Sequence, residues 1–125
     1  MIYLNLEDSL RIHDTIIKEM QGLSGYNKTS LGYLDSALEH IKNDDFYPNF
    51  VDKLTHLMFS CIKFHPFNDG NKRTSIFLAM HFLDVNEKNI KNFAQNMEDV
   101  VVKIAEDNLT KEDLRNIIQN YLNSN

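Results

Sequence analysis

The spacing of apolar residues constrains this chain most, because it follows a helical period along nearly the whole length. Leu6, Leu10, His13, Ile17 and Met20 recur at steps of three or four residues, which is the pattern of an amphipathic α-helix. The chain has 2 prolines and 4 glycines, too few for a turn-rich all-β protein. The sequence therefore predicts an all-α fold, a compact bundle of about six helices.

Breaks in this period set the expected helix boundaries. Glycines, prolines and runs of Asn and Asp interrupt the apolar pattern between the helices. We expect helices over residues 6–21, 30–41, 50–64, 71–85, 97–106 and 111–122, with Asn96 and Thr110 capping the last two. The segment 50–64 is the most apolar and is expected at the centre of the bundle. The segment 71–85 is apolar on most faces, Phe77 included, and is expected in the core as well.

Length, charge and cysteine content limit the class of protein. The chain has 125 residues, of which 42% are hydrophobic and 25% charged, as in an ordinary globular protein. We expect a single domain over residues 1–125. With 18 acidic and 13 basic residues the formal charge is −5, which disfavours binding to nucleic acid or to a membrane surface. The single Cys61 cannot form an internal disulfide, and the absence of a signal peptide or long apolar run predicts a cytoplasmic protein.

One segment, residues 65–74, has a composition that packing does not explain. It reads HPFNDGNKRT and lies between the two most apolar predicted helices. Within ten residues it holds a histidine, an acid, a lysine, an arginine, a proline and a glycine. A simple connection between helices does not require this mixture, so the segment is the candidate functional site. We call it the motif loop.

The end of the motif loop is predicted to bind an anion. Gly70 and Asn71 open the helix at 71–85, where the first N–H groups lack intrahelical partners and the helix dipole adds roughly half a positive charge. Lys72 and Arg73 stand at the same end, although cations are favoured at the opposite end of a helix. An anion with several charges would explain them, and phosphate suits both the backbone groups and the arginine fork.

Three further residues of the motif loop suggest chemistry beside that phosphate. Asp69 is an acid next to a phosphate site, whose natural partner is Mg²⁺, although it could instead pair with Lys72 or Arg73. His65 can accept a proton from an attacking hydroxyl near neutral pH, although a lone histidine is more often structural. Phe67 is expected to point inward and anchor the loop against the core.

Residues 65–73 resemble the signature of the Fic/Doc family, H-x-F-x-[DE]-[GA]-N-[GK]-R. Ile12-His13-Asp14, Gly22 and Gly25, among other positions, are also similar to the short Doc branch of that family. The resemblance implies a small helical domain with this loop between two central helices. Carried over by position, it makes His65 the catalytic base and Asp69 the Mg²⁺ ligand, with Gly70, Asn71, Lys72 and Arg73 holding the phosphates of ATP.

Lys72 separates the two branches of the family. In the Fic branch, which transfers AMP from ATP to a protein hydroxyl, a glycine stands there and leaves room for the phosphates. In the Doc branch a lysine is the rule, and the terminal phosphate of ATP is transferred. The resemblance thus implies a protein kinase that modifies a Ser or Thr, with AMP transfer as the alternative. A third possibility is an inactive module that keeps the loop as a phosphate-binding or partner-binding surface.

The resemblance also implies partners. Doc-like proteins are toxins that act on translation, and elongation factor Tu is the class of target suggested. A self-inhibitory helix of the pattern [ST]-x-x-x-E-[GN] is nearly present at Thr15–Glu19, but Met20 breaks it. The inhibitor is therefore expected to be a separate antitoxin, whose disordered segment folds into a groove on the toxin.

Two regions outside the motif loop leave alternatives open. His13 and Asp14 lie near a helix face, where a buried hydrogen bond is the favoured interpretation. Tyr26 and Lys28 follow Gly25 in a polar segment expected to be a surface loop. They could form a flap over a target peptide, but an ordinary exposed loop explains them equally well.

Overall fold

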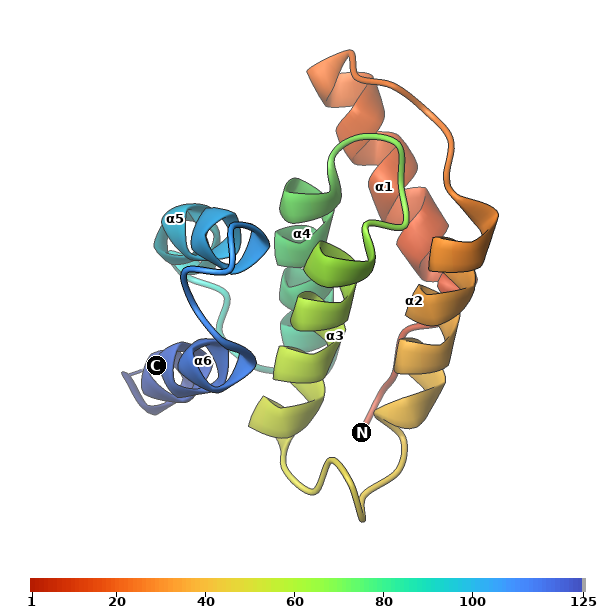
Figure 1. Cartoon of the computed structure of the whole chain (residues 1–125). Coiled ribbons are helices and arrows are strands. Elements are labelled where there is room, and N and C mark those ends of the chain that lie inside the picture. The colour runs from red at the N-terminus through yellow and green to blue at the C-terminus, as the bar shows by residue number, and fades with distance from the viewer. Residues whose placement is uncertain (125) are drawn as a thin grey trace.

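A computed structural model describes residues 1–124, which form six α-helices (Figure 1). The helices are α1 (Leu6–Met20), α2 (Lys28–His40), α3 (Phe50–Phe64), α4 (Asn71–Val85), α5 (Phe93–Ala105) and α6 (Lys111–Ser124). Within those residues the only β-type pairing is one isolated bridge, between Tyr26 and Phe67. The prediction of an all-α bundle of about six helices is confirmed.

The bundle is organised around α3 and α4. In Figure 1 these two helices stand side by side, with α1 and α2 on one flank and α5 and α6 on the other. The central position of α3 is confirmed, because it contacts α2, α4, α5 and α6. Leu54, Leu57, Met58 and Cys61 on α3 are fully buried. The motif loop joins the adjacent ends of the two central helices, so both of its ends are fixed by the core.

The prediction for α4 is right for most of the helix and wrong for Phe77. Leu78, Ala79, Phe82 and Leu83 are fully buried, whereas Phe77 keeps 38% of its surface exposed. The cause is tertiary: α1 covers one side of α4 and α5 covers another, and Phe77 lies between them. Its ring lines a hollow on each side of the helix.

Two helix starts differ from those predicted. The second helix starts at Lys28, two residues early, because Asn27 caps it by accepting a hydrogen bond from Ser30 N at 2.9 Å. The fifth starts at Phe93, and Asn96 is an interior residue whose N–H donates to Asn92 O at 3.0 Å. The prediction that Asn96 caps it is therefore wrong.

These helix starts show where local signals suffice. Phe93 is fully buried, so packing of this ring draws the start of α5 forward. The cap of α6 follows its local signal and is confirmed, since Thr110 Oγ1 accepts from Asp113 N at 3.1 Å.

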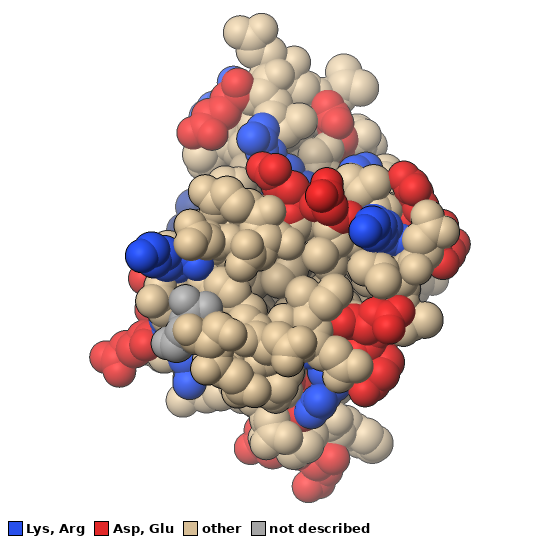
Figure 2. All heavy atoms as spheres, turned by 90° about the vertical axis from the view of Figure 1, so that its left-hand side faces the viewer, with Lys and Arg blue, Asp and Glu red and all other residues tan. Residues whose placement is uncertain are grey.

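The surface on the α5 and α6 side carries charges of both signs. Figure 2 shows acidic and basic side chains interspersed around a central area of uncharged residues. None of the helices in residues 1–124 has the length and apolar character needed to cross a bilayer.

Candidate active site

The part of the motif loop between α3 and α4, residues 65–70, begins and ends in left-handed backbone. His65 follows the last residue of α3 with φ 52° and ψ 56°, a conformation in which histidine is more common than most residues. Gly70 precedes α4 with φ 76° and ψ 20°, where a glycine avoids the cost of a side chain. The two reversals, separated by four residues, turn the chain out of α3 and into α4, and they leave the start of α4 at the surface.

Asn71 holds the loop together from inside. It is 4% exposed, and its side chain pairs with both backbone groups of Phe67: Oδ1 accepts from the N–H at 2.9 Å and Nδ2 donates to the carbonyl at 2.8 Å. The same Nδ2 lies 3.1 Å from His65 Nδ1. All polar atoms of this side chain are therefore engaged within the loop. Its binding to phosphate stays a prediction, and its observed contacts orient His65.

His65 faces solvent beside this clamp. His65 is exposed. The hydrogen bond from Asn71 Nδ2 to Nδ1 fixes the plane of its ring. The second ring nitrogen, Nε2, has no hydrogen-bond partner among residues 1–124. It is therefore the atom of the motif loop that a substrate hydroxyl can reach.

Asp69 lies against the end of α1. Its Oδ2 accepts from Leu23 N at 3.1 Å, and its Oδ1 accepts from Gly70 N at 2.9 Å. A Cβ added to Gly22 would lie 2.6 Å from Asp69 Oδ2, so only glycine allows the carboxylate to approach this closely. Neither Lys72 nor Arg73 pairs with Asp69 in the described chain. The alternative of a simple ion pair is not what the structure contains.

His13 on α1 contacts the motif loop from the interior of the protein. It is 2% exposed, and its Nε2 lies 2.8 Å from the carbonyl oxygen of Asp69. Its ring stacks on Phe67 with the centroids 3.7 Å apart and the planes 8° from parallel. Phe67 is itself 2% exposed. The predicted buried hydrogen bond is confirmed for His13, whose partner is the motif loop, whereas the prediction is wrong for Asp14, which is exposed.

The connection between α1 and α2 pairs with the motif loop. Asn27 N donates to Pro66 O at 2.8 Å, and Asn68 N donates to Gly25 O at 3.0 Å. This pairing brackets the bridge between Tyr26 and Phe67, so the backbone groups of Tyr26 point away from the loop. The connection is thus held against the motif loop by backbone hydrogen bonds, and its role as a flap over a peptide stays a prediction.

Two unpaired cations stand on the first turn of α4. Lys72 and Arg73 are exposed, and neither takes part in an ion pair within residues 1–124. No side chain caps the helix there, so its first N–H groups stay available. Charge and backbone donors thus converge on this surface, and its binding of an anion stays a prediction.

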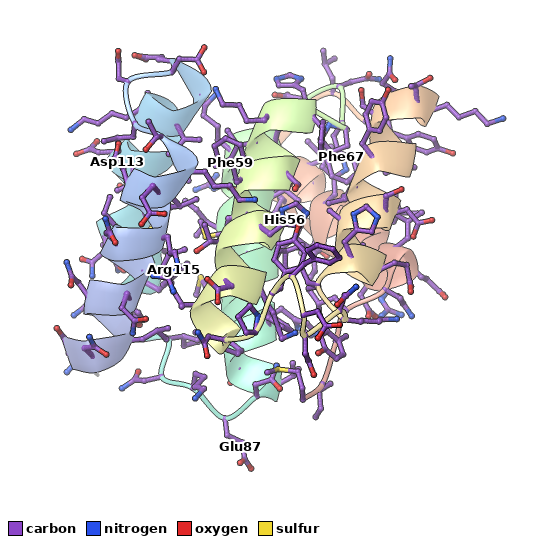
Figure 3. The ribbon with its side chains drawn as sticks, turned by 60° about the horizontal axis from the view of Figure 1, so that its bottom comes forward. His56, Phe59, Phe67, Glu87, Asp113 and Arg115 are labelled. Carbon is purple, nitrogen blue, oxygen red and sulfur yellow. The ribbon has the colours of Figure 1, made fainter. Side chains whose placement is uncertain are left out.

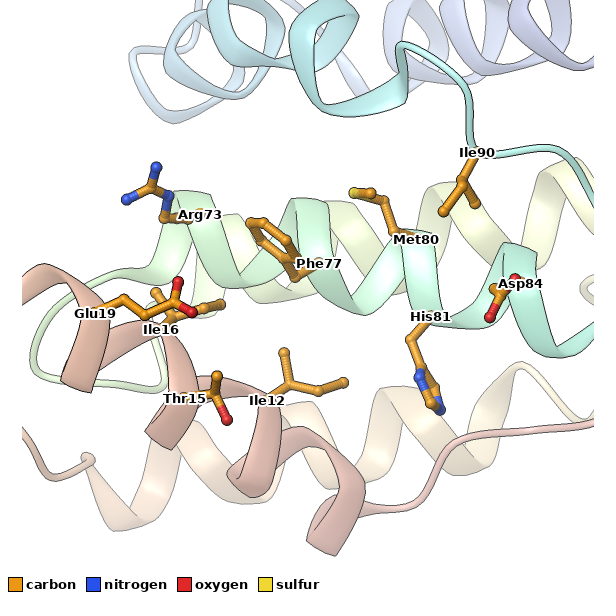
Figure 4. A pocket seen from close by; sticks show the side chains of 10 residues that line it. All are labelled: Ile12, Thr15, Ile16, Glu19, Arg73, Phe77, Met80, His81, Asp84 and Ile90. Atoms are coloured by element: carbon orange, nitrogen blue, oxygen red, sulfur yellow. The ribbon is translucent and has the colours of Figure 1, made fainter.

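Arg73 also borders a groove between α1 and α4. Figure 4 shows its floor, made by Ile12 and Ile16 of α1 and by Phe77 and Met80 of α4. Arg73 lies at one end of this groove, which has a volume of about 350 Å³. A second hollow of about 290 Å³, between α4 and α5, is lined by both Lys72 and Arg73.

The site fits Mg²⁺ in one respect. No group of three or more His, Cys, Asp or Glu side chains in residues 1–124 could hold a metal by itself. Mg²⁺ in nucleotide sites is commonly bound by one or two carboxylates together with substrate phosphates. Asp69, half-buried beside the α4 N-terminus, supplies one such carboxylate.

The structure thus brings together every residue predicted for the site, and it adds two that were not assigned to it. His13 contacts Asp69 from α1, and Gly22 approaches it from the connection that follows this helix. A signal for His13 was present, since it is a polar residue on the apolar stripe of its helix. Nothing in the spacing of Gly22 could show which side chain it approaches.

A family model described as the Fic/DOC family matches residues 3–83, which is more than half of the chain. The chain belongs to the Fic/DOC family. No curated protein matches it. Members of this family are typically ATP-dependent transferases that modify proteins. The matched segment contains α1 to α3, the motif loop and most of α4, and α5 and α6 lie outside it.

Proposed function

We propose that this Fic/DOC protein is a Doc-type kinase that transfers the γ-phosphoryl group of ATP to a Ser or Thr of another protein. The observation that carries the proposal is the unpaired pair Lys72 and Arg73 on the uncapped first turn of α4, next to the exposed His65. Phosphoryl transfer depends mainly on positioning and on stabilising charge on phosphate oxygens. These residues provide both.

The phosphates would lie at the start of α4. The N–H of Gly70 already donates to Asp69 Oδ1, so the free backbone donors begin at Asn71. Arg73 can form two parallel hydrogen bonds to phosphate oxygens, whereas Lys72 supplies a compact charge. Asp69 would hold Mg²⁺ together with those oxygens. The metal, when bound, neutralises negative charge on the phosphates.

His65 would take the proton of the acceptor hydroxyl at Nε2. In the resting arrangement Asn71 donates to Nδ1, which places the ring proton on Nε2. Nε2 can act as a base only in the other tautomer, in which Nδ1 carries the proton and no longer accepts from Asn71. The exposed ring would reach this tautomer by taking a proton from water at Nδ1 and releasing the Nε2 proton to water. A general base of this kind typically contributes about 10²–10⁴-fold to the rate.

The partners belong to the same proposal. The target would be a translation protein, with elongation factor Tu as the class suggested by Doc-like proteins. A separate antitoxin would place a disordered segment as a helix in the groove between α1 and α4, whose floor is apolar. Because Arg73 borders this groove, the bound segment would also obstruct the phosphate site.

The test is label transfer into a bacterial lysate, with ATP labelled at either the α or the γ phosphate and His65→Ala as the control. We expect transfer of the γ label only, and none with His65→Ala although this variant remains folded. Transfer by His65→Ala at the wild-type rate would refute the assignment of the base. No transfer of either label, beside a working relative, would favour the inactive binding module.

AMP transfer is the second candidate, because membership of the Fic/DOC family is compatible with it. Lys72 counts against it, since its side chain occupies the helix start where a glycine would leave room for phosphates. Transfer of the α label would establish AMP transfer. Lys72→Gly should then raise the transfer of the α label relative to the γ label.

A further inference from the structure

His13 makes two contacts with the motif loop, and both involve residues on which the proposed site depends. Its ring stacks on Phe67, and its Nε2 lies 2.8 Å from the carbonyl oxygen of Asp69. It does so from α1, 56 residues away in sequence from Asp69. One ring face and one ring nitrogen of this side chain are thus committed to the motif loop, and the residue is 2% exposed.

The hydrogen bond from His13 to the Asp69 carbonyl fixes the peptide unit between Asp69 and Gly70, which bears on both the carboxylate and the start of α4. The Asp69 carbonyl and the Gly70 N–H belong to the same planar peptide group. That N–H donates to the carboxylate of Asp69 itself at 2.9 Å, and Gly70 is the residue from which α4 starts. A rotation of this peptide would therefore move the carboxylate and change the first turn of α4 together.

Packing alone does not require a histidine at this place. The other inward positions of α1 include Leu6, Leu10, Ile16 and Ile17, so an apolar residue would fill the space against Phe67. A buried imidazole is costly unless its nitrogens are satisfied. The hydrogen bond to the loop explains why a polar ring stands on this apolar face.

We propose that His13 is a positioning residue that sets the Asp69 carboxylate and the start of α4 for the phosphates of Mg²⁺-bound ATP. The inference rests on the proposed function, because it assigns those phosphates to this helix start. His13 would act through the peptide group between residues 69 and 70, without contact to a substrate.

The test separates the donor from the ring. His13→Phe keeps the stacked ring and removes the donor, whereas His13→Gln places an amide N–H near the position of Nε2. Ser9→Ala is the matched control, since Ser9 is fully buried on the same helix and bonds only locally, to Asn5 O. For each variant we would measure the midpoint of thermal unfolding, the affinity for ATP with and without Mg²⁺, and the rate of γ-label transfer.

We expect His13→Phe to stay folded but to lose about 10–100-fold in transfer and in the gain of ATP affinity that Mg²⁺ provides. His13→Gln should retain most of both, and Ser9→Ala should match the wild type per folded molecule. If His13→Phe equals the wild type in transfer and in Mg²⁺-dependent binding, the inference is wrong. The same holds if the losses follow thermal stability across all variants, because that is the behaviour of a packing residue.

Failure of the proposed function gives a different result. If the wild type binds ATP in a Mg²⁺-dependent way that His13→Phe loses, but transfers no label, the kinase assignment fails and the positioning role stands. If the wild type shows neither Mg²⁺-dependent binding nor transfer, both are refuted.

Discussion

The two ends of α3 contain similar side chains and differ in how those side chains are paired. At the motif-loop end, Lys63 pairs with Asp107, but Lys72 and Arg73, beside the exposed His65, take part in no ion pair within residues 1–124. At the opposite end, near the α2–α3 connection, the cations have partners. Lys53 Nζ donates to Ile41 O at 2.6 Å and to Asp44 Oδ1 at 2.7 Å. In this respect the first end leaves two cations available to a ligand, whereas the cations of the second end stabilise the fold.

His56, in the middle of α3, has partners on both ring nitrogens, in contrast to His65. His56 Nε2 lies 3.3 Å from the Tyr47 hydroxyl, and its Nδ1 lies 2.8 Å from Lys111 Nζ. Figure 3 shows His56 on α3 and Arg115 on α6, whose Nε donates to Asp52 Oδ1 at 2.7 Å. These contacts join the α2–α3 connection, α3 and α6. His56 and the cations near it thus have partners within the fold, whereas His65 Nε2 and the side chains of Lys72 and Arg73 have none within residues 1–124.

The largest expected effect is on activity and comes from the unpaired cations. Arg73→Ala should lower the rate of label transfer by about 10²–10³-fold, because it removes a donor to charged oxygens. It should change the free energy of unfolding by less than about 0.5 kcal/mol, as for other exposed residues without partners. Arg115→Ala is the control at the paired end and should leave the rate per folded molecule unchanged. Equal rates for Arg73→Ala and the wild type would remove the distinction between the ends.

The largest expected effect on stability lies at the paired end. Burial, the largest single influence, would lower the pKa of Lys53, but the hydrogen bonds and charges of Asp44 and Tyr3 together outweigh it, so the pKa lies above its ordinary value. Lys53→Ala leaves the buried Ile41 carbonyl without its partner, so unfolding should become easier by about 2–3 kcal/mol. Lys42→Ala, which breaks the exposed pair with Glu39, should cost less than about 0.5 kcal/mol. Urea unfolding measures both, and similar losses would contradict the contrast.

His56 should make stability depend on pH. Burial first, and then the charges of Lys111 and His40, lower the pKa of His56 from 6.5 to about 4. The unfolded chain therefore binds this proton more strongly than the folded one. The stabilising contribution is full above pH 6.5 and is lost as the pH falls from 6.5 towards 4.

The loss in that window should be about 1–2 kcal/mol, which is below the full linkage value because His56 is only half-buried. Urea unfolding at a series of pH values would measure it. In His56→Gln this part of the pH dependence should disappear. A slope of the same size in that variant would show that another group is responsible.

The smallest expected effect compares two buried threonines. Thr74 Oγ1 on α4 is buried without a hydrogen-bond partner among residues 1–124, whereas Thr55 Oγ1 on α3 donates to Val51 O at 2.6 Å. Thr74→Val should therefore stabilise the protein by up to about 1 kcal/mol, and Thr55→Val should not. Thermal unfolding of the two variants tests this. Destabilisation by Thr74→Val would indicate that its hydroxyl has a partner, such as water.

Much of the fold was predictable because it rests on local signals. The spacing of apolar residues predicted the six helices, and the capping residues Thr110 and Asp113 fixed the start of α6. The start of α5 was not predictable in this way. Phe93 packs edge-on against Tyr121 of α6, with the ring centroids 5.1 Å apart, and no local pattern shows a contact across 28 residues of chain.

By itself, the sequence determined which chemical groups the site contains, because residues 65–74 are contiguous and lie at a helix start. Only the tertiary structure decided which atoms surround those groups and which of them have partners. It placed Asn71 inside the loop, set His13 and Gly22 against Asp69, and left Lys72 and Arg73 without partners. The physical reason is that a charge or a hydrogen-bonding atom is defined by what surrounds it. Here the surroundings come from α1 and from the α1–α2 connection, through side-chain hydrogen bonds that span 44 to 56 residues of the chain.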